Sequence, residues 1–161
     1  MAYQKLQPLG AIEWVPTDDV SIPNPGGKVF EDTSDAATLQ DHLLFTAPAG
    51  TNGFVGVVNL GATVQNVTTN EFAKVLHVGK DALKLNYDIF QANSQNFKVY
   101  NVDSSGALIY VGQGGAGTIL EVKTASGNIV SFSDPQTGQT VQILVDEIRS
   151  GTTAGNLVAL W

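Results

Sequence analysis

The chain has 161 residues, a formal net charge of −7 and no cysteine. This length suits one ordinary domain or two very small ones, and the lack of cysteine excludes disulfides, thiolate zinc sites and cysteine nucleophiles. Only 14% of the residues are charged, whereas 17 are glycine and aliphatic residues are plentiful. That balance is typical of an all-β protein with many tight turns and excludes a disordered tail.

The acidic charge also limits the partners. One arginine and seven lysines are too few to neutralise a phosphate backbone, so the sequence predicts no direct contact with nucleic acid. An acidic surface instead keeps copies of the molecule soluble and apart. No apolar stretch approaches the ~20 residues that span a bilayer, and no basic segment precedes an apolar core at the N-terminus. We therefore expect neither a membrane span nor a signal peptide.

Residues 1–37 carry Pro8, Pro16, Pro23 and Pro25. Proline lacks a backbone donor and holds its predecessor extended, so this segment should form an extended arm with at most short edge strands. Its apolar side chains are too many for a solvated tail: Leu6, Leu9, Ile12, Trp14, Val15, Val20 and Ile22. The arm either packs on its own domain or reaches a neighbouring subunit, and the sequence leaves both open.

A short helix is expected near the end of the arm. Within residues 31–41, Ser34 can cap the N-terminus of a helix whose Leu39 and Leu43 share one face. Such a helix of two turns would need tertiary support.

Residues 38–101 consist of short strand-like runs separated by turns that contain Asn or Gly. Phe54–Leu60 is one such apolar run. A second run alternates at a period of two: Leu83, Leu85, Tyr87 and Ile89 against Lys84, Asn86 and Asp88. This spacing predicts a small β-barrel with the apolar set inside, inserted between the arm and the C-terminal part. A module this small should depend on contacts with the rest of the chain for its stability.

Residues 102–161 begin a second series of strands, which includes a predicted hairpin. Its loop is Ala125-Ser126-Gly127, and a three-residue loop favours a left-handed glycine at its end. The resulting register pairs two apolar residues of each strand on one face: Leu120 with Phe132 and Val122 with Val130. Two further runs, Val141–Ile148 and Asn156–Trp161, complete a sheet.

The expected fold is therefore all-β. It comprises an extended N-terminal arm at 1–37 that belongs to an outer β module, a small inserted β-barrel at 38–101, and a C-terminal module at 102–161 that resembles a β-sandwich or barrel.

One motif suggests a cofactor, but its context argues against it. Gly112–Gly117 spells G-x-G-x-x-G, the dinucleotide fingerprint, which requires a helix after the last glycine. The residues that follow are β-branched and alternating, so a strand is expected there. We predict no cofactor.

Other chemistry-bearing residues are sparse. His42 and His77 are far apart in sequence, and the paired carboxylates Asp18-Asp19 and Glu31-Asp32 lack the spacing of a calcium loop. No nucleophile elbow of the form G-x-S-x-G occurs. The sequence predicts no metal site, no catalytic residue and no enzymatic activity.

Several motifs resemble a family of small tailed-bacteriophage virion proteins that decorate the capsid or form the base of a head spike. They are Tyr110-Val111-Gly112 with Gly114-Gly115, then Val122, Gly127 and Phe132, and the ending Gly151-Thr152-Thr153-Ala154 to Val158-Ala159-Leu160-Trp161. The N-terminal segment matches at Pro16-Thr17-Asp18 and Ile22-Pro23-Asn24-Pro25, and the Asn66–Tyr100 segment matches more loosely. The resemblance implies a structural role on the capsid exterior, as a decoration or cement protein or a spike base.

That resemblance also implies partners and a location. The partners would be the major capsid protein or other virion proteins, and the protein would be made in the bacterial host cytoplasm and reside in the virion. A neck, collar or tail component of the same virion is the alternative. A carbohydrate-binding module is a remote one, with stacking faces from Trp14, Tyr87, Tyr110 and Trp161.

Both chain ends offer apolar material for an interface with another subunit or the capsid. The candidate residues are Leu6, Leu9, Ile12, Trp14, Leu160 and Trp161. A chain end that does not fray needs such contacts. A homo-oligomer is expected, and the resemblance implies a trimer. If the arm serves assembly alone, deletion of residues 1–15 should leave a folded monomer that fails to bind virions.

Overall fold

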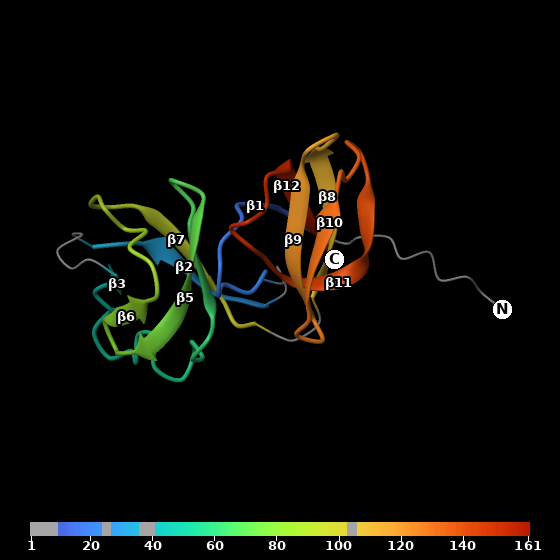
Figure 1. Cartoon of the computed structure of the whole chain (residues 1–161). Coiled ribbons are helices and arrows are strands. Elements are labelled where there is room, and N and C mark those ends of the chain that lie inside the picture. The colour runs from blue at the N-terminus through green and yellow to red at the C-terminus, as the bar shows by residue number, and fades with distance from the viewer. Residues whose placement is uncertain (1–9, 24–26, 36–40, 103–105) are drawn as a thin grey trace. The chain divides into compact units, whose positions relative to one another are not determined.

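The computed structural model describes residues 10–23, 27–35, 41–102 and 106–161. In these ranges the regular elements are twelve strands, arranged in two six-stranded antiparallel sheets (Figure 1). The all-β prediction is confirmed. The same ranges contain no helix that is long and apolar enough to cross a membrane.

The chain divides into two compact units, and the second is inserted into the first. The first unit is Met1–Pro16 with Ser104–Trp161, and the second is Thr17–Asp103. The boundary expected at residue 38 is wrong, because strand β2 (Lys28–Thr33) pairs with β7 (Asn96–Tyr100) of the second unit. Only the part of the arm before Thr17 belongs to the first unit.

The first unit contains six strands in the order β1-β12-β8-β11-β9-β10. Their bounds are β1 Ala11–Trp14, β8 Ala107–Gln113, β9 Ile119–Thr124, β10 Ile129–Ser133, β11 Thr140–Ile148 and β12 Gly155–Leu160. The register of β11 shifts between Val141 and Val145, so its first half pairs with β8 and its second half with β9. Because such an irregularity bends a strand, β11 can serve both halves of the sheet.

The predicted hairpin is confirmed in its register. Leu120 pairs with Phe132 and Val122 with Val130, and Gly127 has a φ of 90° at the end of the loop. The two β9 side chains are fully buried, whereas Val130 and Phe132 are only half-buried. The difference arises because β10 is an edge strand.

The second unit has the strand order β2-β7-β4-β5-β6-β3. The bounds not yet given are β3 His42–Leu44, β4 Thr63–Asn66, β5 Glu71–Val78 and β6 Ala82–Leu85. The two edges of this sheet approach each other, since the N–H of Asp35 donates to the carbonyl of Leu44 at 2.8 Å. The rings of Phe30 and Phe45 also lie 5.1 Å apart. The sheet therefore curls around an aromatic core in the manner of a barrel.

The helix expected at residues 31–41 is wrong wherever that segment is described. Glu31–Thr33 is the end of β2, and Leu43 lies in β3; Leu39 lies outside the described residues. The hydroxyl of Ser34 accepts the N–H of Gln95 at 3.0 Å, and residues 36–40, which would form most of the expected helix, lie outside the described residues. In the described part of the segment, residues 31–33 pair with β7 instead.

The run Phe54–Leu60 forms turns rather than a strand. Gly53 and Gly56 adopt φ values of 56° and 79°, which fold the chain back on itself, and the N–H of Val57 donates to the carbonyl of Phe54. Phe54 is buried, but Leu60 is exposed. A β-branched composition does not make a strand where glycines repeatedly reverse the chain.

The predicted alternation of buried and exposed side chains from Leu83 to Ile89 is found in only part of that run. Leu83, Leu85 and Ile89 are buried as expected, but Tyr87 is 39% exposed. The strand ends at Leu85, after which the side chain of Asn86 accepts the N–H of Lys74 at 2.7 Å. Tyr87 turns outward and donates its hydroxyl to the carbonyl of Asp18 at 3.0 Å.

Tyr100 gives the second unit a predicted sensitivity to alkaline pH. Its hydroxyl donates to Oε1 of Gln65 at 3.2 Å. Burial, assisted by the charge of Glu31, raises the pKa of the phenol above its ordinary value of 10.0. The folded state favours the neutral phenol, so this contribution is complete below pH 10 and is lost as the pH rises through the raised pKa.

Tyr100→Phe should therefore cost about 1 kcal/mol of unfolding free energy at pH 7, through the lost hydrogen bond. The variant should also lose less stability than the wild type between pH 9 and about 11. Urea unfolding across this range measures both effects. If both proteins lose the same unfolding free energy over this pH range, a group other than Tyr100 is responsible for the loss.

Candidate functional site

The two chain ends pair with each other inside the first unit. Strand β1 lies beside β12, with Ile12 opposite Ala159 and Trp14 opposite Leu157 (Figure 1). The N–H of Gly10 donates to the carbonyl of Trp161 at 3.2 Å, and the N–H of Trp161 donates back at 3.1 Å. Residues 10–14 and 157–161 are thus paired with each other within one subunit.

This pairing changes the expected interface. Trp14 is only 2% exposed, so its ring is core and is wrong as a contact for a partner. Ile12, Leu160 and Trp161 are half-buried. Leu6 and Leu9 lie outside the described residues.

The pairing also changes the expected effect of truncation. Deleting residues 1–15 would remove β1 from the sheet and the buried side chain of Trp14, so we expect this truncated chain to lose stability rather than to stay folded. A deletion confined to residues 1–9 leaves both in place and is the appropriate test of the arm.

The aromatic residues considered for sugar stacking are divided between the two units. The buried ring of Trp14 offers no face, and Tyr87 belongs to the second unit. Tyr110 is 37% exposed in β8. The carbohydrate-binding reading therefore gains no geometric support from these residues.

The motif residues near the C-terminus have structural roles in the first unit. The hydroxyl of Thr152 accepts the N–H of Glu121 at 2.9 Å and donates to its carbonyl at 3.0 Å. The hydroxyl of Thr153 accepts the N–H of Ile119 at 2.9 Å. These threonines continue the pairing of β9 beyond the end of β11, which explains why hydroxyl side chains stand there.

Gly112 marks a close approach of β8 to β12. A Cβ atom at Gly112 would lie 2.5 Å from the carbonyl oxygen of Asn156. Gly112→Ala should therefore cost about 2 kcal/mol of unfolding free energy through overpacking. Gly138→Ala is the control, because Gly138 has a φ of 84° but no atom within 4 Å of its would-be Cβ, and about 1 kcal/mol is expected. Urea unfolding of both variants tests whether Gly112→Ala is the more destabilising of the two. An equal loss of unfolding free energy would contradict the steric explanation.

The glycine-rich segment Gly112–Gly117 leads into a strand. Strand β9 begins at Ile119, and the hydroxyl of Thr118 donates to the carbonyl of Gly115 at 2.7 Å. The helix that a dinucleotide site needs at this point is therefore missing from the described residues that follow the motif.

The histidines lie on different strands of the second unit. His42 in β3 has its Nδ1 2.7 Å from a carboxylate oxygen of Asp41, and His77 lies in β5. Across the described ranges, no three His, Cys, Asp or Glu side chains converge as metal ligands.

A charged cluster does occur in the first unit, around the buried side chain of Glu147. Nζ of Lys123 donates to Oε1 of Glu147 at 2.6 Å and lies 3.8 Å from Asp146. Nη1 of Arg149 lies 3.6 Å from Oε2 of Glu147, and its Nε lies 3.5 Å from Glu121. Opposite charges alternate through the cluster, so it is suited to holding β9 against β11 rather than to chemistry.

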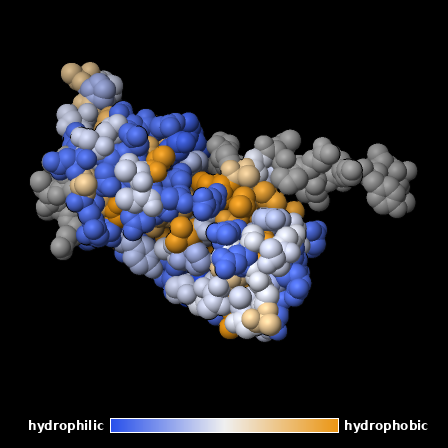
Figure 2. All heavy atoms as spheres, turned by 90° about the horizontal axis from the view of Figure 1, so that it is seen from above, coloured by the Kyte–Doolittle hydropathy of each residue, from blue (hydrophilic) through white to orange (hydrophobic). Residues whose placement is uncertain are grey.

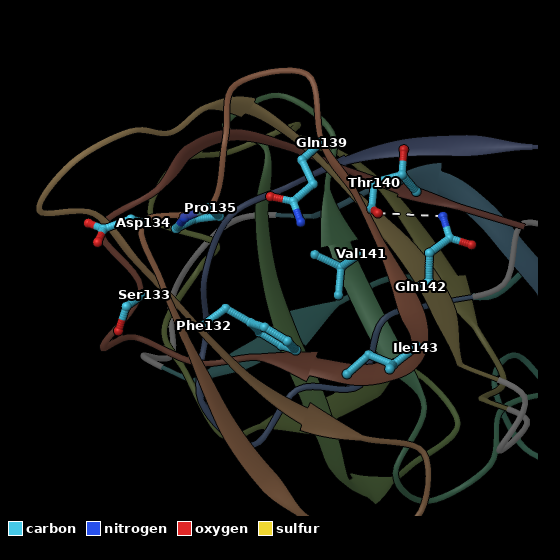
Figure 3. A pocket seen from close by; sticks show the side chains of 9 residues that line it. All are labelled: Phe132, Ser133, Asp134, Pro135, Gln139, Thr140, Val141, Gln142 and Ile143. Carbon is cyan, nitrogen blue, oxygen red and sulfur yellow. Dashed lines mark hydrogen bonds between the residues drawn. The ribbon is translucent and has the colours of Figure 1, made fainter.

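A groove of about 500 Å³ lies between β10 and the first half of β11. Its lining residues are Phe132, Ser133, Asp134, Pro135, Gln139, Thr140, Val141, Gln142 and Ile143. Figure 3 shows the side chains of Phe132, Val141 and Ile143 turned toward one another. The groove is thus apolar in its centre and carries amides, hydroxyls and one carboxylate around it.

Apolar side chains are also exposed on the strands beside this groove. Ile129 in β10 is 60% exposed and Leu144 in β11 is 52% exposed. Figure 2 shows that apolar groups interrupt a mainly hydrophilic surface on the face it presents. The sequence analysis identified β10 and β11 as strands but missed the groove, because no local signal shows that the two do not pair.

The second unit has a comparable hollow of about 540 Å³. Phe30, Phe45 and Pro48 lie on it, together with the turns of Gly53–Val57. Val55 and Val57 are 47% and 40% exposed. Phe30 and Asp32 come from the edge strand β2, and the other lining residues belong to loops and turns.

Comparison of the chain with protein-family models, curated proteins and solved structures finds no match.

Proposed function

We propose that this protein is a structural component of a tailed-bacteriophage virion, which binds the capsid exterior as a decoration or cement protein or as the base of a spike. The sequence motifs that resemble this family support the proposal. So does their placement, since Gly112, Thr152 and Thr153 fit close contacts that define the first unit.

The observation that carries a binding role over a catalytic one is the open groove beside β10. It combines an apolar centre with a strand edge, whereas the ionisable clusters of the described residues are ion pairs that hold strands together. In this proposal the partners are copies of the same chain, as a cyclic trimer, and the major capsid protein or other virion proteins. Shell proteins match the local symmetry of the lattice on which they sit.

Immunogold labelling of intact phage particles with an antibody to this protein tests the proposal. Gold over the head shell is the expected result. Gold confined to the neck, collar or tail would replace the capsid role with the alternative, and particles that contain none of the protein would refute a virion role altogether.

The contribution of the N-terminal segment can be tested separately. A chain lacking residues 1–9 keeps Gly10, β1 and Trp14, so it should stay folded. Under the proposal it sediments as a smaller species than the full chain and binds particles less well. If this shortened chain sediments and binds particles like the full chain, residues 1–9 have no role in assembly.

A further inference from the structure

The outer edge of β10 has backbone groups that no strand uses. The N–H of Thr124 donates to the carbonyl of Asn128, and the N–H of Asp134 donates to the carbonyl of Thr118. Hydrogen-bonded pairs alternate along an antiparallel pair of strands. Given the register of β9 and β10, the backbone groups of Ile129, Ser131 and Ser133 point away from β9.

The pattern on β9 agrees with this assignment. Ile119 and Glu121 stand opposite Ser133 and Ser131, and their backbone groups bond on the other side of β9, to Thr153, Thr152 and Arg149. No strand of the described residues lies beyond β10 in the sheet order. As far as the described residues go, the edge is therefore open.

A second open position lies across the groove on β11. Gln139 and Val111 are hydrogen-bonded, so the bonded positions of β11 continue at Val141, and the backbone of Thr140 points away from β8. Consistent with this, the Thr140 carbonyl accepts only its neighbour's side chain, Nε2 of Gln142, at 3.4 Å among the described contacts (Figure 3). Both walls of the groove thus offer backbone groups.

Among the four edge strands in the described part of the chain, β10 alone lacks a feature that prevents pairing with another strand. Proteins protect exposed edges with charges, prolines, bulges or very short strands. Strand β1 carries Glu13 at its edge, β2 carries three charged residues and a register shift, and β3 has three residues. Strand β10 is Ile-Val-Ser-Phe-Ser with an unbroken register, so it has none of these devices.

We propose that the groove binds an extended peptide segment of a partner protein, which adds as a strand along β10. The open backbone groups on both walls fit a single strand. The apolar centre formed by Phe132, Val141 and Ile143 would receive alternate aliphatic side chains of that strand.

The charges on the groove define the segment further. Its one ionisable lining side chain is Asp134, whose Oδ1 already accepts the N–H of Gly117 at 2.6 Å. Because the side chains at the centre of the groove are apolar, the part of the segment that lies there is uncharged. This inference goes beyond the virion role. It does not depend on that role, because it rests on the groove and the β10 edge rather than on the sequence resemblance.

The test uses the full-length, ¹⁵N-labelled protein and a synthetic peptide, acetyl-Thr-Val-Thr-Val-Thr-Val-Thr-amide. Saturable shifts of the Ser131, Ser133 and Thr140 amide signals are expected, with at least about tenfold slower hydrogen exchange at Ser131 and Ser133. The control peptide has the same side chains but methyl groups on all backbone nitrogens, and it should not bind.

Variants separate strand addition from general adhesion. In Ser131→Pro the lost N–H is the one that points outward, which an edge strand tolerates, so the fold should persist while peptide affinity falls at least about tenfold. Ser131→Lys places a guarding charge on the edge without altering the backbone and should have the same effect. Ser126→Lys, in the exposed hairpin loop, should bind the peptide like the wild type.

Three results would overturn the proposal. Equal binding of the methylated peptide would indicate apolar adsorption, and shifts that map away from β10 would place the site elsewhere. Edge amides that become protected on raising the protein concentration alone, with no response to peptide, would show that a second copy of the chain occupies the edge.

Discussion

Phe97→Ala should lower the free energy of unfolding of the second unit by about 4 kcal/mol, the largest single effect expected in this protein. Phe97 is fully buried in β7, and its ring centroid lies 6.0 to 6.3 Å from those of Phe30, Phe45, Phe54 and Phe90. Truncation removes the ring on which the other four converge. The cavity left behind cannot close, because those rings are held by different strands and turns.

Urea unfolding monitored by circular dichroism measures this loss. Val55→Ala is the matched control, because Val55 lies near the same cluster but is 47% exposed, and a change within about 0.5 kcal/mol is expected. A loss below about 1 kcal/mol for Phe97→Ala would contradict a packed aromatic core. The aromatic core would then not hold the curled sheet together.

Lys123→Met should destabilise the first unit by about 3 kcal/mol. The side chain of Glu147 is 5% exposed, and Nζ of Lys123 donates the hydrogen bond to its Oε1. Removing that donor leaves a buried carboxylate whose remaining cation, Arg149, lies 3.6 Å from the other oxygen. Desolvation of the charge is then poorly offset, and the cost exceeds that of a surface ion pair.

A second substitution distinguishes this mechanism from lost packing. In Lys123→Met with Glu147→Leu the buried charge is gone, so more than half of the stability should return. Lys28→Met is the control: its ion pair with Glu31 is exposed on both sides, and its loss should cost less than about 1 kcal/mol. Equal costs for Lys28→Met and Lys123→Met would refute the role of burial.

The amino-acid sequence alone determined the features that depend on neighbouring residues. The β9–β10 hairpin follows from the position of Gly127 and from the alternation around it, so its register could be predicted. The strand character of β11 and β12 follows from their apolar patterning in the same way. The all-β class required only the abundance of such runs and turns.

Tertiary structure decided the features that depend on distant partners. Residues 31–33 lie in a segment for which the sequence predicts a short helix, but they pair with β7. Tyr87 continues the apolar alternation of its run, but its hydroxyl donates to the carbonyl of Asp18. The sequence predicts Trp14 as an interface residue, but the pairing of β1 with β12 places it in a buried position. In each case a long-range hydrogen bond or burial outweighs a local preference worth only a fraction of a kcal/mol or so.

The groove beside β10 is likewise a feature that only the tertiary structure decided. Nothing in Ile129–Ser133 distinguishes an edge strand from a central one, since its apolar alternation fits both. One side of β9 bonds to β11 and to the threonines Thr152 and Thr153, the other side pairs with β10, and no described strand pairs with the outer side of β10. A strand pairs on one side or on two according to what the whole chain brings beside it, and only the folded sheet fixes that.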